Sequence, residues 1–129
     1  MVNKLNRPSV HDIRAMKARG QKISMLYVTT LEEAAAADAA GVDMLSIEAK
    51  HFSPEMRAAA GLCFVQVGLP FGQYGNNVTA EDYLRAAFHF TAMGGDSFYC
   101  AASFEIQQVL CANHVPIVAH VGMNPNIVT

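Results

Sequence analysis

An unbroken apolar run near the middle of the chain constrains the fold more than any other stretch. Residues 62–65 (LCFV) begin this run, which continues to Val67 and is followed by Gly68, Pro70 and Gly72. A run rich in β-branched and aromatic residues that stops at Gly and Pro is typical of a strand buried on both faces, as in a parallel sheet. In parallel α/β proteins, the loop after such a strand lies at the edge where ligands bind.

The segments on either side of this run repeat the same order of strand and helix. Strands are predicted at residues 22–29, 43–48, 96–101 and 116–120, two before the central run and two after it. Helices are predicted at residues 9–20, 32–40, 54–60, 80–93 and 104–113. Their starts are indicated by N-capping residues, namely Ser9 with Asp12, Thr30 with Glu33, Ser53 before Pro54, Thr79 with Asp82, and Ser103. The alternation predicts an α/β fold with a parallel sheet.

Composition restricts the class of protein further. A chain of 129 residues with 52% hydrophobic content has the size of one domain with a buried core. The net charge is −2 and the basic residues are scattered, so no nucleic-acid partner is expected. The apolar runs are too short to span a bilayer and the first residues lack the apolar core of a signal peptide, so a cytoplasmic protein is expected. Cys63, Cys100 and Cys111 are predicted to be buried, reduced thiols.

Five β/α steps make a sheet that twists toward a barrel but cannot close it, because a (β/α)₈ barrel needs about 250 residues. One alternative is an open doubly wound sheet, and the other is the front part of a longer protein. The bare edge of the last strand favours the second alternative. We therefore predict one domain over residues 1–129, with a leading helix in 1–21 and five β/α units in 22–129. These units would be strands one to five of a TIM-barrel type fold, and the exposed edge favours a homo-oligomer.

Four segments together resemble one enzyme family. Residues 9–26, 40–48, 67–74 and 115–128 are similar, in the same order, to the ketopantoate hydroxymethyltransferase (3-methyl-2-oxobutanoate hydroxymethyltransferase) family. The most specific patterns are LPFG-x-Y at residues 69–74 and H-x-G-x-x-P from His120 to Pro125. The family belongs to the phosphoenolpyruvate mutase/isocitrate lyase superfamily of barrels. The resemblance covers the N-terminal half of the family's barrel and implies a transferase of pantothenate biosynthesis that forms multimers.

The family's reaction resembles an aldol addition, in which Mg²⁺ holds a small 2-oxo acid and stabilises its enolate. The enolate then attacks a one-carbon unit carried by methylenetetrahydrofolate. The family's three carboxylate ligands of Mg²⁺ correspond to Ala49, Gly68 and Ala101, and a substrate lysine corresponds to Tyr99. Since Mg²⁺ requires oxygen ligands, chiefly carboxylates, we expect its site to be absent or badly weakened here. The connection after the second strand is also shorter than the family's.

Two residues are candidates for catalysis. His120 ends the fifth strand and could bind a carboxylate or keto oxygen or transfer a proton. Tyr99 occupies an inward position of the fourth strand, where its phenol could donate to a substrate oxygen. The alternatives are a core histidine and an aromatic side chain that fills the barrel. Tyr74, in the loop after the central strand, is a candidate for substrate binding or a packing anchor. Cys100 alternates away from Tyr99 and is expected in the core.

The turn after the second strand supplies the other candidates for substrate binding, Glu48, Lys50 and His51. Strand alternation sends Glu48 and Ala49 to opposite faces. If Ala49 faces the mouth of the barrel, Glu48 faces the helices, unless a bulge or an early end of the strand reverses this. Lys50 and His51 could reach the site from the loop or form a solvated turn.

Three functions follow from these residues. The first is a hydroxymethyltransferase-like enzyme that acts on a small 2-oxo acid with a remodelled or metal-free site. The second is another lyase or mutase of the superfamily that makes or breaks a C–C or P–C bond next to a carboxylate. The third is a non-catalytic relative that binds a metabolite or a partner subunit.

Overall fold

A computed structural model describes residues 7–69 and 78–122 of the chain. Each of the predicted strands and helices is present, with bounds that differ by a few residues. The first strand is the most shortened. In order, the elements are α1 (Val10–Ala18), β1 (Met25–Tyr27), α2 (Leu31–Ala39), β2 (Met44–Glu48), the 3₁₀ turn η1 (Ala49–His51), α3 (Pro54–Ala59), β3 (Phe64–Gly68), α4 (Ala80–Ala92), β4 (Ser97–Cys100), α5 (Phe104–Ala112) and β5 (Ile117–Ala119).

The five strands form one sheet in the order β1-β2-β3-β4-β5, and all four neighbouring pairs are parallel. Doubly wound sheets reverse their strand order partway through the chain, whereas this sheet follows the sequence without reversal. The protein therefore has an α/β fold that is compatible with part of a TIM barrel. The residues of β1, the first edge strand, are exposed.

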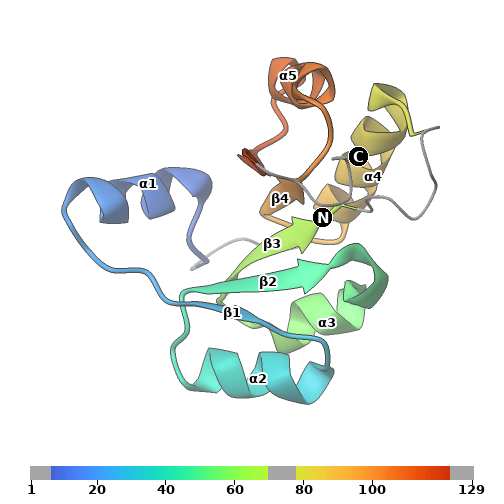
Figure 1. Cartoon of the computed structure of the whole chain (residues 1–129). Coiled ribbons are helices and arrows are strands. Elements are labelled where there is room, and N and C mark those ends of the chain that lie inside the picture. Colours follow the sequence, from blue (N-terminus) through green and yellow to red (C-terminus); the bar gives the residue numbers. More distant parts are fainter. Residues whose placement is uncertain (1–6, 70–77, 123–129) are drawn as a thin grey trace.

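One face of the sheet carries the core. The side chains of alternate strand residues on this face are almost completely buried, namely Leu45, Ile47, Val65, Val67, Phe98 and Cys100. They belong to one cluster with buried residues of α2, α3, α4 and α5. In Figure 1, α2 and α3 lie together beside β1 and β2, while α1 stands apart, on the side where the strands begin. The packed face is therefore set by the period-two alternation of strand residues.

The helices begin where their capping residues predict. Ser9 with Asp12, Thr30 with Glu33, and Thr79 with Asp82 form reciprocal capping boxes. Ser53 and Ser103 cap α3 and α5 by accepting a hydrogen bond from the backbone N–H three residues on. These bonds pair backbone N–H groups that the first turn of a helix leaves without partners.

Replacing Thr79 by alanine should lower the free energy of unfolding by about 1 kcal/mol, because the first turn of α4 loses its side-chain acceptor. Urea denaturation followed by circular dichroism measures the loss. Thr79→Ser keeps the acceptor oxygen and should retain most of the stability. An equal loss in both variants would show that the hydroxyl oxygen is not what stabilises the helix.

A buried ionic cluster joins the start of the chain to the amino end of the sheet. Asp96 directly precedes β4, and its carboxylate accepts hydrogen bonds from Arg7 at 2.9 Å, from Arg57 at 3.3 Å and from the backbone N–H of Val65 at 3.0 Å. The side chains of the three charged residues are 3–4% exposed. Burial and the neighbouring Arg7 charge lower the pKa of Arg57 to about 10. The cluster connects the segment before α1, helix α3 and strands β3 and β4.

Two of the three cysteines are buried as predicted, but the prediction for the third was wrong. Cys63 and Cys100 are buried, and burial raises the pKa of both thiols. Cys111 is exposed, because it lies on the side of α5 that faces away from the sheet. No helix among the described residues is long and apolar enough to cross a membrane.

Candidate functional site

The second face of the sheet carries three rows of side chains, set by the strand register. The row nearest the amino end is apolar and consists of Met25, Met44 and Phe64. The middle row is polar and consists of Tyr27, Ser46, Gln66 and Ser97. The row at the carboxyl edge consists of Glu48, Gly68, Tyr99 and Val118. Polarity on this face therefore increases toward the edge at which parallel α/β proteins bind ligands.

Tyr99 and His120 meet at this carboxyl edge. The phenol oxygen of Tyr99 is hydrogen-bonded to Nδ1 of His120, and the rings lie edge to face with centroids 5.9 Å apart. His120 directly follows β5, where its backbone N–H donates to the carbonyl of Cys100 at 2.9 Å. Both side chains are partly buried. The arrangement places a phenol and an imidazole in contact, and such a pair can hold a proton and pass it between oxygen and nitrogen.

Glu48 forms a second polar cluster at the same edge. Its carboxylate accepts a hydrogen bond from the Tyr27 hydroxyl at 2.6 Å and forms an ion pair with the ammonium group of Lys50 at 3.1 Å. These two partners lower the pKa of Glu48, and the same carboxylate raises the pKa of Tyr27. Glu48 is therefore an ionised carboxylate that an ammonium group already partly neutralises.

Glu48 and Ala49 lie on opposite sides of the sheet, as strand alternation predicts, but it is Glu48 and not Ala49 that lies away from the helices. Glu48 lies in the same row as Tyr99, on the face opposite the helix-covered core. Ala49, which was expected to face the mouth of a barrel, begins η1 and packs against the core instead. The reason is that Glu48 follows the buried Ile47 in β2 and therefore shares the opposite face with Ser46.

The remaining predicted residues have different outcomes. Lys50 and His51 lie in η1. Hydrogen bonds are the main cause of the lowered pKa of Glu33 and of Glu48, and the nearby His51 makes a smaller contribution in the same direction. Tyr74 falls outside the described residues. The prediction from the sequence brought together Glu48 with Lys50 and Tyr99 with His120, but it did not single out Tyr27. That residue could have been found from the register of β1 against β2, which places it one row below Glu48.

Ser46, Gln66 and Ser97 were also not recognised from the sequence. Nε2 of Gln66 donates a hydrogen bond to the Ser46 hydroxyl at 3.3 Å across β2 and β3. Gln66 and Ser97 are buried. Within the part of the chain that the structure describes, the Ser97 hydroxyl is a buried polar group with no hydrogen-bond partner. The signal in the sequence is a polar residue between two apolar strand residues, as at Ser46 and Gln66, but it does not show that these residues lie side by side.

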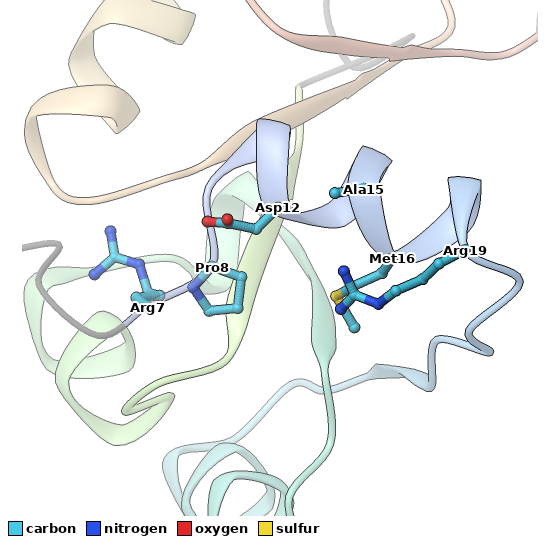
Figure 2. A pocket seen from close by; sticks show the side chains of 6 residues that line it. All are labelled: Arg7, Pro8, Asp12, Ala15, Met16 and Arg19. Carbon is cyan, nitrogen blue, oxygen red and sulfur yellow. The ribbon is translucent and has the colours of Figure 1, made fainter.

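A hollow of about 420 Å³ lies beside α1, lined by Arg7, Pro8, Asp12, Ala15, Met16 and Arg19. Figure 2 shows the side chains of Met16 and Arg19 next to one another, with the Arg7 guanidinium pointing away from both. The polar groups of this hollow already have partners. Arg7 binds Asp96, Asp12 caps α1 through Ser9, and Arg19 donates to Gln21. The carboxyl edge is the stronger candidate for a ligand site, because parallel α/β proteins bind ligands where their strands end.

The carboxyl edge does not match the donor set that Mg²⁺ requires. Among residues 7–69 and 78–122, no three His, Cys, Asp or Glu side chains are grouped closely enough to hold a metal ion. The carboxylate at this edge, that of Glu48, has its oxygens engaged by a phenol and an ammonium group. Octahedral Mg²⁺ is bound through carboxylates, phosphates and water, so the described side chains do not fit it.

The fold and the edge together define a parallel β/α protein with a candidate site for a small polar ligand where its strands end. No family model matches the chain. Its curated relatives are named 3-methyl-2-oxobutanoate hydroxymethyltransferase. They include proteins from Cytophaga hutchinsonii (29% identical, covering 94% of this chain and 53% of the relative), Desulfotalea psychrophila (29%, 92% and 50%) and Lysinibacillus sphaericus (28%, 88% and 49%). These similarities support a distant relationship to that family.

Two features of these matches bear on the site. The chain spans about half the length of the curated relatives it matches. The match to the Cytophaga hutchinsonii protein extends over 146 aligned positions, more than the 129 residues of this chain. The relative therefore has residues inside the aligned region for which this chain has no counterpart.

Proposed function

We propose that the protein binds a small 2-oxo acid, or a related carboxylate, at the carboxyl edge of the sheet and acts on it in hydroxymethyl transfer of the aldol type. The observation that carries this proposal is the contact between Tyr99 and His120 on adjacent strands. The distant similarity to 3-methyl-2-oxobutanoate hydroxymethyltransferases supports the class of substrate. Methylenetetrahydrofolate would be the co-substrate, as expected from the resemblance to the family.

The polar groups have distinct roles in this proposal. Lys50, whose side chain is 57% exposed, attracts the carboxylate of the substrate, and Glu48 orients its ammonium group through the ion pair at 3.1 Å. His51, in the same turn, is a further candidate for binding the substrate carboxylate. Tyr99 donates its hydroxyl to the keto oxygen. His120 takes the proton from the carbon next to the keto group, while the electrons of the broken C–H bond move onto the keto oxygen as an enolate. Hydrolysis of methylenetetrahydrofolate by one water breaks its two bonds from nitrogen to the methylene carbon and releases tetrahydrofolate and formaldehyde. The enolate carbon bonds to the formaldehyde carbon as the C=O π bond breaks, and the resulting alkoxide takes the proton from His120 to give the hydroxymethyl group.

This route uses no carboxylate-bound metal ion. Since Glu48 is engaged by Tyr27 and Lys50, the charge of the developing enolate is balanced by hydrogen bonding from Tyr99 and by the ammonium group of Lys50. Hydrogen-bond donors aimed at a developing oxyanion can contribute about 10²–10³ in rate.

A calorimetric titration of the purified full-length protein with 3-methyl-2-oxobutanoate tests the proposal. Binding should be observed and should not change when Mg²⁺ is added or chelated. Hydroxymethyl transfer from methylenetetrahydrofolate is assayed alongside. Transfer that depends on Mg²⁺ would contradict the metal-free site, and absence of binding by any 2-oxo acid would contradict the proposed substrate class.

Substitution of the two catalytic candidates gives a sharper result. His120→Ala should lower the turnover rate by about 10²-fold or more, because the acceptor of the substrate proton is lost. Tyr99→Phe keeps the ring and should lower the turnover rate while the melting temperature stays unchanged. His89→Ala is the matched control, since His89 lies on α4 and contacts Phe90. Equal turnover in His120→Ala and His89→Ala would remove His120 from the site.

A non-catalytic binding protein is the second candidate. It is favoured by the ion pair between Glu48 and Lys50, because the Glu48 carboxylate already has a cationic partner. Binding of a 2-oxo acid that depends on Tyr99 and His120 but is never followed by transfer would identify this function.

A further inference from the structure

The middle row on the second face of the sheet differs in composition from the interior of a filled barrel. In TIM barrels the interior is packed by layers dominated by Val, Ile and Leu. Here the middle row holds four hydrogen-bonding side chains, Tyr27, Ser46, Gln66 and Ser97. Burying such groups is unfavourable unless they have partners. Tyr27 is exposed and Ser46 is half-buried, whereas Gln66 and Ser97 are buried. The buried part of the row, directly below the carboxyl edge, therefore calls for a polar partner.

The Ser97 hydroxyl is the position where that partner is missing. Ser97 is 4% exposed, and its hydroxyl has no hydrogen-bond partner within the described part of the chain. It lies beside Gln66 in the register and two residues before Tyr99 on the same face of β4. Residues two apart on a strand are separated by about 6.6 Å, a distance that a small 2-oxo acid can span.

The path from the carboxyl edge to this row begins at Gly68. Gly68 lies between Glu48 and Tyr99 in the edge row and two residues after Gln66 on β3. It contributes no side chain above Gln66, and a Cβ placed there would make only ordinary contacts, the nearest at 3.6 Å to the backbone of Glu48. The edge row therefore has no side chain at its centre, between the two polar clusters that would hold the acid end of the ligand.

The middle row contains hydroxyl and amide groups but no cation. A second carboxylate on the ligand would be buried there without an opposite charge, which is unfavourable. An alkyl tail would leave the Ser97 hydroxyl without a partner. An uncharged group that both donates and accepts, such as a carboxamide, matches Gln66 and Ser97.

We infer that the row of Ser46, Gln66 and Ser97 binds the tail of the ligand, and that the ligand is a 2-oxo acid whose tail carries an uncharged hydrogen-bonding group. This inference rests on the proposed function, because Tyr99, His120 and Lys50 hold the acid end. It differs from the proposed function in making the tail polar, whereas 3-methyl-2-oxobutanoate has a branched alkyl tail.

Three isosteric acids test the inference in calorimetric titrations of the full-length protein. They are 2-oxosuccinamate with a carboxamide tail, 4-methyl-2-oxopentanoate with an alkyl tail, and oxaloacetate with a carboxylate tail. We expect 2-oxosuccinamate to bind about tenfold more tightly than either of the others, as two new hydrogen bonds predict. Equal or tighter binding of the alkyl or the charged acid would overturn the inference.

Ser97→Ala is the decisive variant. It should remove most of the preference for 2-oxosuccinamate and leave the affinity for 4-methyl-2-oxopentanoate unchanged. It should not lower the melting temperature, because the hydroxyl has no partner to lose in the ligand-free chain. A lowered melting temperature would show that the hydroxyl is needed by the fold, and the inference would fail. Ser103→Ala, which removes only the cap of α5, is the control that should lower the melting temperature and keep the preference.

The outcomes separate the two proposals. If none of these acids and no other 2-oxo acid binds, the proposed function fails and the inference fails with it. If all three acids bind equally and binding depends on His120, the proposed function stands and only the inference about the tail fails.

Discussion

Replacing Asp96 by alanine is expected to lower the free energy of unfolding by about 3–5 kcal/mol, since it removes one partner from a buried ion cluster. Arg7 and Arg57 would face each other at the amino end of the sheet without the carboxylate between them. The backbone N–H of Val65 would lose its acceptor as well. The pKa of Arg57 is already lowered by burial and by Arg7, so these two charges repel each other in the intact cluster.

Equilibrium denaturation in guanidinium chloride measures the effect. Asp82→Ala is the matched control, because Asp82 is an exposed carboxylate that caps α4, and it should lower the free energy of unfolding by about 1 kcal/mol. Asp96→Asn keeps an acceptor oxygen and the shape of the side chain but loses the negative charge, so it should also be strongly destabilising. A loss in Asp96→Ala no greater than that in Asp82→Ala would show that the arginines find other partners.

Gly61→Ala should be the second most damaging change, at about 2–4 kcal/mol. Gly61 has φ +50° at the end of α3, and a Cβ placed there would lie 2.1 Å from the nearest carboxylate oxygen of Asp38. That carboxylate accepts a hydrogen bond from the backbone N–H of Leu62 at 2.9 Å. The added methyl group would push Asp38 away and break this bond.

Gly41→Ala separates the cost of the left-handed backbone from the cost of displacing Asp38. Gly41 has φ +78° and nothing within 4 Å of the Cβ position, so its substitution reports the cost of the left-handed backbone alone. We expect about 1–2 kcal/mol for Gly41→Ala and a clearly larger loss for Gly61→Ala, both measured as shifts in denaturation midpoint. If the two losses are equal, Asp38 moves aside at no cost.

Much of the fold could be predicted from the sequence because its signals are local. The capping boxes at Ser9, Thr30 and Thr79 fix where three helices begin. Each box joins two residues that are only three apart, so the pair can be recognised in the sequence. The apolar run before Gly68 predicted a central strand, and β3 is buried on both faces up to Val67. The exposure of Cys111 could not be predicted in the same way, because an apolar helix residue gives little sign of which side it occupies.

The candidate site could be predicted only in part, since it depends on where strands end. The contact between Tyr99 and His120 follows from two inward positions on neighbouring strands. The face of Glu48 was misjudged because Ala49 was supposed to face the site, and one residue of difference reverses the direction of a side chain. The row of Ser46, Gln66 and Ser97 depends on the register between strands, which no local pattern in the sequence gives.

The ionic cluster and the polar edge occupy opposite ends of the strands. The hydrogen bonds of Arg7, Arg57 and Asp96 described above bind the amino end, whereas Glu48, Tyr99 and His120 lie where the strands finish. The buried ion cluster and the proposed ligand site are thus formed by separate sets of residues. Substitutions at the carboxyl edge should therefore leave the cluster at the amino end intact, so that the proposed site can be varied on an unchanged scaffold.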